Sequence, residues 1–490
     1  MWTFVIVLAF FLGSTTMQIS GFLLKEASSP ATGLSGPRVE AEQQPNVVIV
    51  MVDDLDEGLL DTLFANGFMP NLQYQVAQFG TTFSNSFVST SLCCPSRVTL
   101  FTGQYSHNHG VYGNILPAGG VTVFDDNSSL NIWLQDAGYR TGFVGKYLNG
   151  YGKNTNKPQS PKDYYKYVPP GWDDWQALID PETYQVYDYN INDNKAVRRF
   201  GSTPAAYQTD VLKNRSNDFI NESDALNDEQ PFFLLVNTLA PHREDAWVGN
   251  MPGCDTSAQW AKGIRSAPRH LGTLPSSIQM PQPPSINEAD VSDKPWWFDG
   301  NRPLMTPLDI TCAQEQYRER AESMLAVDDL VGSLISNLTS KNEWDNTVFI
   351  FVSDNGWYYG EHRLSGKVIG YEEGIRVPLI MKVPGATHRN VSEIVLNNDL
   401  APTILDLTKI SPGLVMDGRS LVPLLSSNNV SASTRKRFLV EFLSTSYFSI
   451  PIFPTFSAIR TGSEDTIVPN SYYVEWDDGE KEFYDLAKDP

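Results

Sequence analysis

Short runs of apolar residues that end abruptly at polar side chains constrain the fold of this chain more than any other feature. Three such runs are 46–52, 231–236 and 347–352, and a weaker one is 141–145. Runs that are apolar at nearly every position are typical of strands buried on both faces of a parallel sheet. From about 45 to 425 they alternate with helical patterns, which predicts an α/β domain.

Polar and charged side chains stand at or shortly after the end of each predicted strand. In open α/β sheets, ligands bind beyond the carboxyl ends of the strands, so these side chains are expected to meet in one crevice. The residues concerned are Asp53, Asp54, Lys146, His242, Asp354 and Asn355. The sequence therefore predicts a functional site at this edge of the sheet.

The predicted crevice combines oxygen ligands with cationic groups. Three carboxylates and one carboxamide offer only oxygen, which suits Ca²⁺ or Mg²⁺ and not zinc, which prefers nitrogen and sulfur. These ligands are Asp53, Asp54, Asp354 and Asn355. Donors for the oxygens of an anion come from Arg97, Lys146, His242 and Lys367. Each residue alone could be a turn cap, a solvated lysine or a loop histidine, but their joint position favours a site.

A further pattern is Cys93-Cys94-Pro95-Ser96-Arg97, which matches the signature C-x-P-S-R. An arbitrary cysteine pair is usually two buried thiols, but other motifs accompany this one in order along the chain. The ordered motifs are Ser91 to Arg97, His107-Asn108-His109, Gly145 to Asn149, Ala240-Pro241-His242 and Val327 to Val331. Through them the chain resembles the sulfatase family, in particular the branch of arylsulfatases and N-acetylglucosamine-6-sulfatases.

This resemblance implies both a fold and a reaction. The fold is an alkaline-phosphatase-like three-layer α/β/α sandwich with a smaller C-terminal antiparallel β-sheet domain. The reaction is hydrolysis of a sulfate ester after a formylglycine-generating enzyme has oxidised Cys93 to formylglycine. One hydroxyl of the hydrated aldehyde attacks sulfur, a lysine or histidine protonates the leaving alcohol, and the other hydroxyl drives release of sulfate.

The resemblance also assigns roles to the predicted site residues. Position 93 joins Asp53, Asp54, Asp354 and Asn355 as a metal ligand, and Arg97, Lys146, His242 and Lys367 bind the anion and transfer protons. One position departs from the family, because many sulfatases have a histidine where this chain has Leu148. Asn149 is expected to take part of that role, and His362 is a candidate for substrate contact or proton transfer.

The N-terminal segment and the glycosylation sequons predict a secreted protein or one in a lysosome-like compartment. Residues 1–20 resemble a signal peptide, and 21–44 form a leader rich in Ser, Pro and Gly. The candidate glycosylation sites are Asn127, Asn214, Asn221, Asn337, Asn390 and Asn429. The cysteines outside the signature, Cys254 and Cys312, are the expected disulfide. No later segment is apolar enough to span a membrane.

The charge balance limits the class of partner. With 57 acidic and 36 basic residues the formal net charge is -21, which argues against nucleic acid and anionic membranes. An anionic ester must therefore be attracted locally, by the metal and the cationic side chains.

Two aromatic-rich segments and one long helix organise the middle of the chain. The apolar periodicity predicts a helix over 316–341, with Asp328 and Asp329 near its solvated side. Segments 164–189 and 241–307 are predicted to be irregular excursions over the mouth of the site. Their aromatic side chains suit stacking on an aryl ring or on a sugar.

The pattern changes after about residue 425 to short β-like runs at 437–442, 472–476 and 482–484. Asp477-Asp478-Gly479 predicts a hairpin turn between the last two runs. The expected domains are thus 45–425, catalytic, and 426–490, an antiparallel sheet that stops earlier than in the family and is expected to lack its final element.

Two other functions fit parts of this pattern. A phosphomonoester or phosphonate hydrolase shares the fold and also binds a tetrahedral anion. A catalytically silent protein that binds sulfated ligands without modification of Cys93 is the second alternative. The sequence leaves open whether the sulfated substrate is an aryl ester or a sugar 6-sulfate.

Overall fold

The computed structural model describes residues 44–153, 160–226, 229–245, 254, 263–298, 302–425, 435–444 and 453–488. The predicted signal peptide, nearly all of the leader and the sequon at Asn429 lie outside these residues. Within the described part, no helix is both long and apolar enough to cross a membrane.

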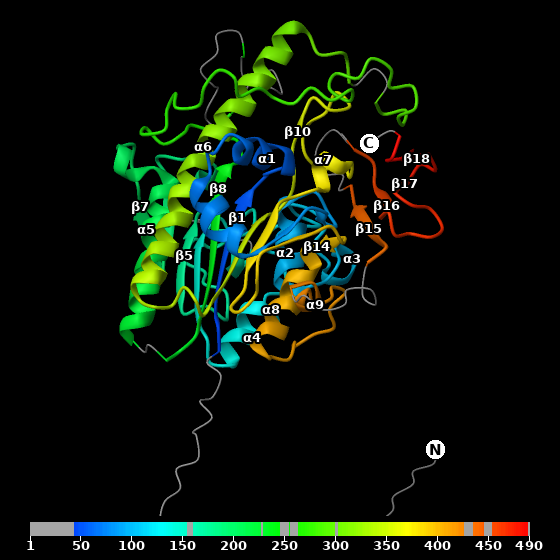
Figure 1. Cartoon of the computed structure of the whole chain (residues 1–490). Coiled ribbons are helices and arrows are strands. Elements are labelled where there is room, and N and C mark those ends of the chain that lie inside the picture. The colour runs from blue at the N-terminus through cyan, green and yellow to red at the C-terminus, as the bar shows by residue number, and fades with distance from the viewer. Residues whose placement is uncertain are drawn as a thin grey trace, which may run out of the picture. The chain divides into compact units, whose positions relative to one another are not determined.

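A ten-stranded mixed sheet forms the framework (Figure 1). Its strands are β1 Asn46–Asp53, β2 Thr81–Phe83, β4 Arg140–Gly145, β5 Asp174–Leu178, β6 Asn190–Asp193, β7 Ala196–Arg199, β8 Phe232–Pro241, β9 Thr347–Ser353, β12 Leu379–Lys382 and β13 Arg389–Val391. Their order is β13-β2-β12-β9-β1-β8-β4-β5-β6-β7. The neighbours β9, β1, β8, β4 and β5 are parallel, so the carboxyl ends of all four predicted strands share one edge.

Helices cover both faces of this sheet. The longer ones are α1 Glu57–Ala65, α2 Cys93–Thr102, α4 Leu130–Asp136, α5 Gln208–Leu226, α6 Pro307–Ser340 and α8 Leu400–Thr408. Val48 and Val50 of β1 pack in one core with α1, α5 and α6, whereas Val47 and Ile49 pack in another with α2, α4 and α8. Figure 1 shows α5 and α6 on one side and α2, α4 and α8 on the other. The predicted three-layer α/β/α sandwich is confirmed.

Short elements connect these layers. They are α3 Ser106–His109, α7 Glu372–Ile375, α9 Val422–Leu425, β3 Ser86–Phe87, β10 Tyr358–Tyr359, β11 Ser365–Gly366 and β14 Val395–Leu396. Between β8 and α6 the described residues contain no helix or strand, as predicted for 241–307.

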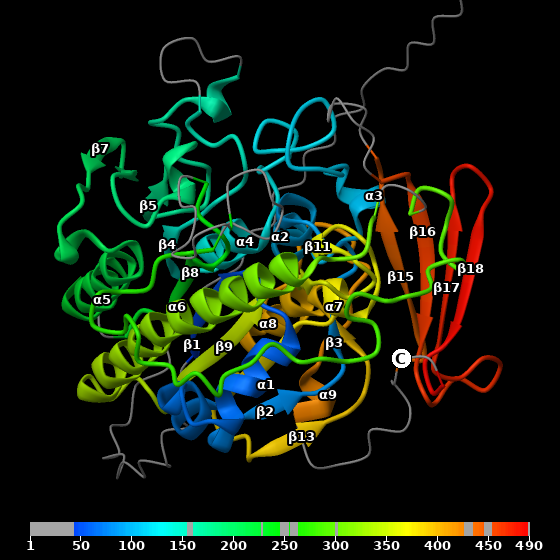
Figure 2. The ribbon, with the colours of Figure 1, turned by 90° about the horizontal axis from the view of Figure 1, so that it is seen from above.

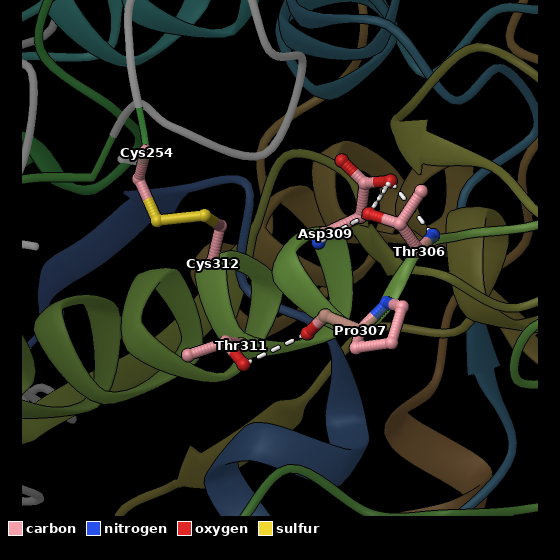
Figure 3. Close-up of a disulfide and its surroundings, with 6 residues drawn as sticks. All are labelled: Cys254, Thr306, Pro307, Asp309, Thr311 and Cys312. Atoms are coloured by element: carbon pink, nitrogen blue, oxygen red, sulfur yellow. Dashed lines mark hydrogen bonds between the residues drawn. A yellow bond between two sulfur atoms is a disulfide. The ribbon is translucent and has the colours of Figure 1, made fainter. Parts of the chain in front are cut away.

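Helix α6 begins at Pro307, about two and a half turns before the predicted start at residue 316. Thr306 caps it by accepting a hydrogen bond from the Asp309 amide at 3.2 Å, and the Asp309 carboxylate accepts one from the Thr306 amide at 2.8 Å (Figure 3). The predicted disulfide between Cys254 and Cys312 is present and ties this first part of the helix to the preceding loop (Figure 3).

The prediction that both aspartates of α6 lie near the solvated side is wrong for Asp328. Only 3% of Asp328 is exposed, and its carboxylate accepts hydrogen bonds from the amides of Asn71 and Leu72 at 3.0 and 2.8 Å. Asp329 does lie near the surface, where it pairs with Arg269 at 2.6 Å. Asp328 therefore holds α6 against the segment that follows α1, a partnership that helical periodicity does not reveal.

The segment 164–189 is not simply an excursion over the site, because it contains strand β5 of the main sheet. Its side chains Trp172, Trp175 and Tyr189 are buried. Aromatic residues occur both in cores and on binding surfaces, so composition alone did not show that these side chains are buried.

The C-terminal sheet consists of β15 Arg437–Phe442, β16 Phe456–Thr461, β17 Ser471–Trp476 and β18 Lys481–Asp485. All neighbours are antiparallel, and β17 and β18 form the predicted hairpin. Strand β16 was not predicted. Phe438 and Val440 share a core with Phe87 and Ile375, so the sheet packs directly on the α/β part (Figure 2). The predicted boundary at 425 and 426 adjoins residues outside the described part.

Four of the candidate glycosylation sites, Asn127, Asn214, Asn221 and Asn390, have exposed side chains. Asn337 is half-buried, and its Nδ2 donates a hydrogen bond to Asn217 Oδ1 at 2.9 Å. That nitrogen is the atom to which a glycan would be attached, so Asn337 is the poorest acceptor among the described sites.

Candidate active site

The residues predicted to follow the strands meet at one edge of the sheet. The Asp54 amide, just after β1, donates to Asp354 Oδ1 at 3.0 Å, just after β9. Lys146, just after β4, forms an ion pair with Asp53. His242, just after β8, has its Nε2 3.5 Å from Asp54 Oδ2. The structure therefore brings together the end of each predicted strand.

Backbone conformation fixes two of these residues. Gly145 has φ +114°, and a Cβ there would lie 1.9 Å from the Asn237 carbonyl oxygen, so only glycine lets β4 turn Lys146 toward the site. Asp54 itself is left-handed, with φ 68°. Its carbonyl accepts a hydrogen bond from the buried Arg320, which also donates to the Pro241 carbonyl at 2.9 Å.

Arg320 is a site-supporting residue that the sequence analysis missed. Its Nε also donates to the Tyr359 hydroxyl at 2.8 Å, so one side chain links the ends of β1 and β8 to strand β10. A signal was available, because Arg320 lies four residues before Met324 on the apolar face of the predicted helix. A charged side chain on such a face needs a buried partner.

Cys93 enters the site at the first turn of α2. Its Sγ lies 2.7 Å from Lys367 Nζ and 3.8 Å from Asp53 Oδ1. Burial raises the pKa of the Cys93 thiol. Cys94 faces elsewhere, because its Sγ contacts Asn149 Oδ1 at 3.2 Å. The two adjacent cysteines thus have different surroundings, and only Cys93 faces the charged cluster.

Three side chains form a group that could hold a hard cation, and Asn355 lies beside them, with its Nδ2 2.7 Å from Asp54 Oδ1. One ligand atom each from Asp53, Asp54 and Cys93 lie within 4.8 Å of one another. Asp54 Oδ2 and Asn355 Oδ1 are buried and accept no hydrogen bond from any described residue. Buried oxygens without donors are costly unless a cation satisfies them, so this donor set fits Ca²⁺ or Mg²⁺.

Three cations, Arg97, Lys146 and Lys367, offset the charge of the carboxylates. Arg97 Nε donates to Asp354 Oδ2 at 2.8 Å, and Arg97 Nη1 donates to the Lys146 carbonyl at 2.9 Å. Lys367 Nζ forms an ion pair with Asp54. The dense packing of opposite charges explains why all of these side chains can be buried.

The same packing separates the pKa values of the acidic groups. Burial alone would raise the pKa of Asp53, but the Lys146 cation, together with the other positive groups, holds it well below its ordinary value. Burial and then the charge of Asp53 raise the pKa of Asp354 to about 6. Burial lowers the pKa of His242 to about 3, so its imidazole is neutral at neutral pH. His242 Nδ1 must donate to the Arg243 carbonyl, 2.6 Å away, which leaves Nε2 free to accept a proton.

The two predicted substrate contacts have different surroundings. Asn149 is close to the site, where its Nδ2 donates to the Tyr184 hydroxyl at 2.6 Å. His362 lies in the loop between β10 and β11, and its charged neighbours are Glu288 at 2.9 Å and Glu373 at 4.0 Å. The structure thus places His362 at the rim and not among the residues at the strand ends.

Known proteins show which family has this arrangement. The sulfatase family model matches residues 45–410, and a model described as the C-terminal part of N-sulphoglucosamine sulphohydrolase matches 360–490. A sulfatase of Caenorhabditis elegans, named as an extracellular Sulf-1 homologue, is 34% identical over 79% of the chain, and the chain spans half of its length. An arylsulfatase of Volvox carteri is 33% identical over 92% of the chain and 71% of its own length. An N-acetylglucosamine-6-sulfatase of Capra hircus is 32% identical over 94% of the chain and 80% of its own length.

Solved structures agree on the fold. A protein in complex with its substrate D-glucosamine-2-N,6-O-disulfate is 23% identical, with a TM-score of 0.70 over 91% of this chain and 92% of its own. A phosphonate monoester hydrolase of Agrobacterium radiobacter is 22% identical, with a TM-score of 0.66 over 91% of this chain and 90% of its own. Fold alone does not separate these activities. The sequence matches show the family: the chain belongs to the sulfatase family.

Proposed function

We propose that this protein hydrolyses sulfate esters with formylglycine, formed from Cys93, as the nucleophile. The observation that carries this proposal is the position of Cys93 Sγ, which lies among Lys367, Asp53 and the other oxygen ligands. The sulfur stands where the oxygens of the hydrated aldehyde would lie. Cys94, in contrast, contacts Asn149 and has no place in the reaction.

Asp53, Asp54, Asp354 and Asn355 would hold Ca²⁺ or Mg²⁺ together with the modified residue 93. The bound cation supplies positive charge that activates the nucleophile and offsets charge on the sulfuryl group. The unpaired oxygens of Asp54 and Asn355 support this assignment. Zinc is a poor fit, because the set contains no imidazole or thiolate once Cys93 is modified.

The remaining polar side chains bind the ester and move protons. Lys367 contacts the sulfur of Cys93, and Lys146 forms an ion pair with Asp53. Both ammonium groups can therefore donate hydrogen bonds to sulfuryl oxygens. Arg97 holds Asp354 and the Lys146 backbone in place. A lysine ammonium protonates the alcohol as the bond between sulfur and the ester oxygen breaks, whereas the neutral His242 can accept a proton at Nε2.

A comparison of two nitrophenyl esters tests the reaction class. The purified, modified protein is expected to hydrolyse nitrophenyl sulfate with a higher kcat/KM than nitrophenyl phosphate at the same pH. A higher kcat/KM for the phosphate ester would favour the phosphomonoester or phosphonate hydrolase instead. Absence of turnover on any sulfate ester, with formylglycine present at position 93, would favour a silent binding protein.

The relatives suggest natural substrates and a location. Proteins named arylsulfatase and N-acetylglucosamine-6-sulfatase match most of this chain, so both an aryl sulfate and a sugar 6-sulfate are reasonable substrates to assay. Relatives named as extracellular sulfatases, together with the signal-like residues 1–20, support a secreted or lysosome-like location. Measuring kcat/KM on nitrophenyl sulfate and on 6-sulfated N-acetylglucosamine would rank the two substrate classes.

A further inference from the structure

We propose that the Tyr184 hydroxyl donates a hydrogen bond to a non-bridging oxygen of the sulfuryl group, an inference that rests on the proposed function. Tyr184 ends a short 3-10 turn, Glu182–Tyr184, that follows β5. Lys146 Nζ lies over its ring, 4.8 Å from the centroid, and the His242 ring is 5.1 Å away. Tyr184 thus borders two residues of the site through its ring.

The hydrogen bonds of Asn149 show which role the hydroxyl oxygen plays. The Sγ–H of Cys94 donates to the side-chain oxygen Asn149 Oδ1 at 3.2 Å, and the backbone amide of Asn149 donates back to Cys94 Sγ at 3.1 Å. This exchange fixes the side-chain amide, so Asn149 Nδ2 faces Tyr184 and donates to its oxygen at 2.6 Å. The Tyr184 oxygen is therefore an acceptor for Asn149, and its own hydrogen must point elsewhere.

Among the described residues, no acceptor receives the Tyr184 hydroxyl hydrogen. Burial raises the pKa of Tyr184 well above its ordinary value, so the hydroxyl keeps this hydrogen across the working pH range. A phenol in such a place normally finds a partner, because an unmade hydrogen bond in a partly buried site is costly. The acceptor that the site is built to receive is an anionic ester.

The nearby side chains Leu148, Tyr187 and Tyr189 are not placed to donate a hydrogen bond to the ester. Leu148 is 2% exposed and packs in the core on the α2 side of the sheet, so it offers nothing to the crevice. Tyr187 and Tyr189 are buried, whereas Tyr184 remains half-buried. Among these residues, only Tyr184 combines contact with Lys146 and a partly exposed side chain.

The test replaces only the hydroxyl. Tyr184→Phe keeps the ring against Lys146 and is expected to lower kcat/KM for nitrophenyl sulfate about 10- to 100-fold, the usual loss for a hydrogen bond to a charged group. The inhibition constant for inorganic sulfate should rise by a similar factor, with the melting temperature and metal content unchanged. Tyr187→Phe, three residues away, is the matched control and should change neither constant.

Three outcomes would overturn the inference. They are an unchanged kcat/KM, an unchanged inhibition constant for sulfate, and an equal effect of Tyr187→Phe. A purely structural role would lower the melting temperature without raising the inhibition constant for sulfate. The proposed function fails separately, if the unsubstituted protein with formylglycine at position 93 hydrolyses no sulfate ester.

Discussion

The floor and the rim of the crevice are built in different ways. We define the floor as the strand-end residues Asp53, Asp54, Lys146, Asp354 and Asn355, and the rim as the loop 360–364 with segment 283–298. The parallel strands place the floor, since β1 pairs with β9 up to Val52 and Ser353, so that Asp53 and Asp354 follow side by side. The rim is held by hydrogen bonds between two loops.

Arg363 is the main connection in the rim. Its guanidinium donates to the carbonyls of Glu288, Ala289 and Arg302 at 2.8, 3.0 and 3.0 Å. His362 and Arg363 are both left-handed, with φ 50° and 56°, a conformation that costs non-glycine residues about 1 kcal/mol or more each. The floor is therefore set by sheet register, whereas the rim depends on contacts that must offset local strain.

The largest expected effect comes from the nucleophile in the floor. Cys93→Ala should lower turnover of nitrophenyl sulfate by at least about 10⁴-fold, because no other nucleophile is positioned there. Circular dichroism and the melting temperature should show an intact fold. Cys94→Ala is the matched control, since Cys94 faces Asn149, and it should retain most activity. Equal losses in the two variants would contradict the assignment.

The next effect concerns the metal that the floor is expected to hold. Asp54→Asn removes one anionic ligand of similar shape and should weaken binding of Ca²⁺ or Mg²⁺ by at least about 100-fold, with a parallel loss of activity. Chelation of the unsubstituted protein should lower its melting temperature, because the clustered carboxylates then repel one another. Elemental analysis that found stoichiometric zinc without calcium or magnesium would disprove the site as described.

A smaller effect is expected from the rim. Arg363→Ala releases segment 283–298 from the loop that leads to Lys367, and it should lower kcat about tenfold with little change in metal content. Arg198→Ala, on the exposed strand β7, is the control and should have no effect. If Arg363→Ala also removed the metal, floor and rim would not be separate structures.

The smallest effect is a pH dependence of stability. Burial raises the pKa of Glu361, in the rim, from its ordinary 4.5 to about 8. The folded state binds the proton more tightly, so this contribution to stability is full below pH 4.5 and is lost as pH rises through 8, by up to about 1.4 kcal/mol per pH unit. Glu361→Gln should flatten the fall in melting temperature over this window, whereas the exposed Glu222→Gln should not. A fall that stayed as steep in Glu361→Gln would contradict the assignment.

The sequence predicted the floor far better than the rim for a physical reason. Strands such as β1 and β9 are apolar along their whole length, and parallel pairing then forces their polar ends together. The disulfide between Cys254 and Cys312 was also predictable, because only two cysteines lie outside the signature.

What the sequence did not reveal depends on long-range partners. Asp328 was misplaced because the amides that donate to its carboxylate lie in a distant segment, at Asn71 and Leu72. Arg320 and Tyr184 belong to the site through neighbours more than thirty residues away in the chain, such as Pro241 and Asn149. Such contacts have no local periodicity, so pattern analysis cannot find them.

The state of residue 93 tests the central claim most directly. The protein is produced with and without a formylglycine-generating enzyme, the fraction of formylglycine at position 93 is measured by peptide mass mapping, and kcat for nitrophenyl sulfate is measured on the same samples. We expect kcat to rise in proportion to the fraction of formylglycine at Cys93 and to vanish when that fraction is zero. Equal turnover by protein that retains an unmodified Cys93 would contradict the account.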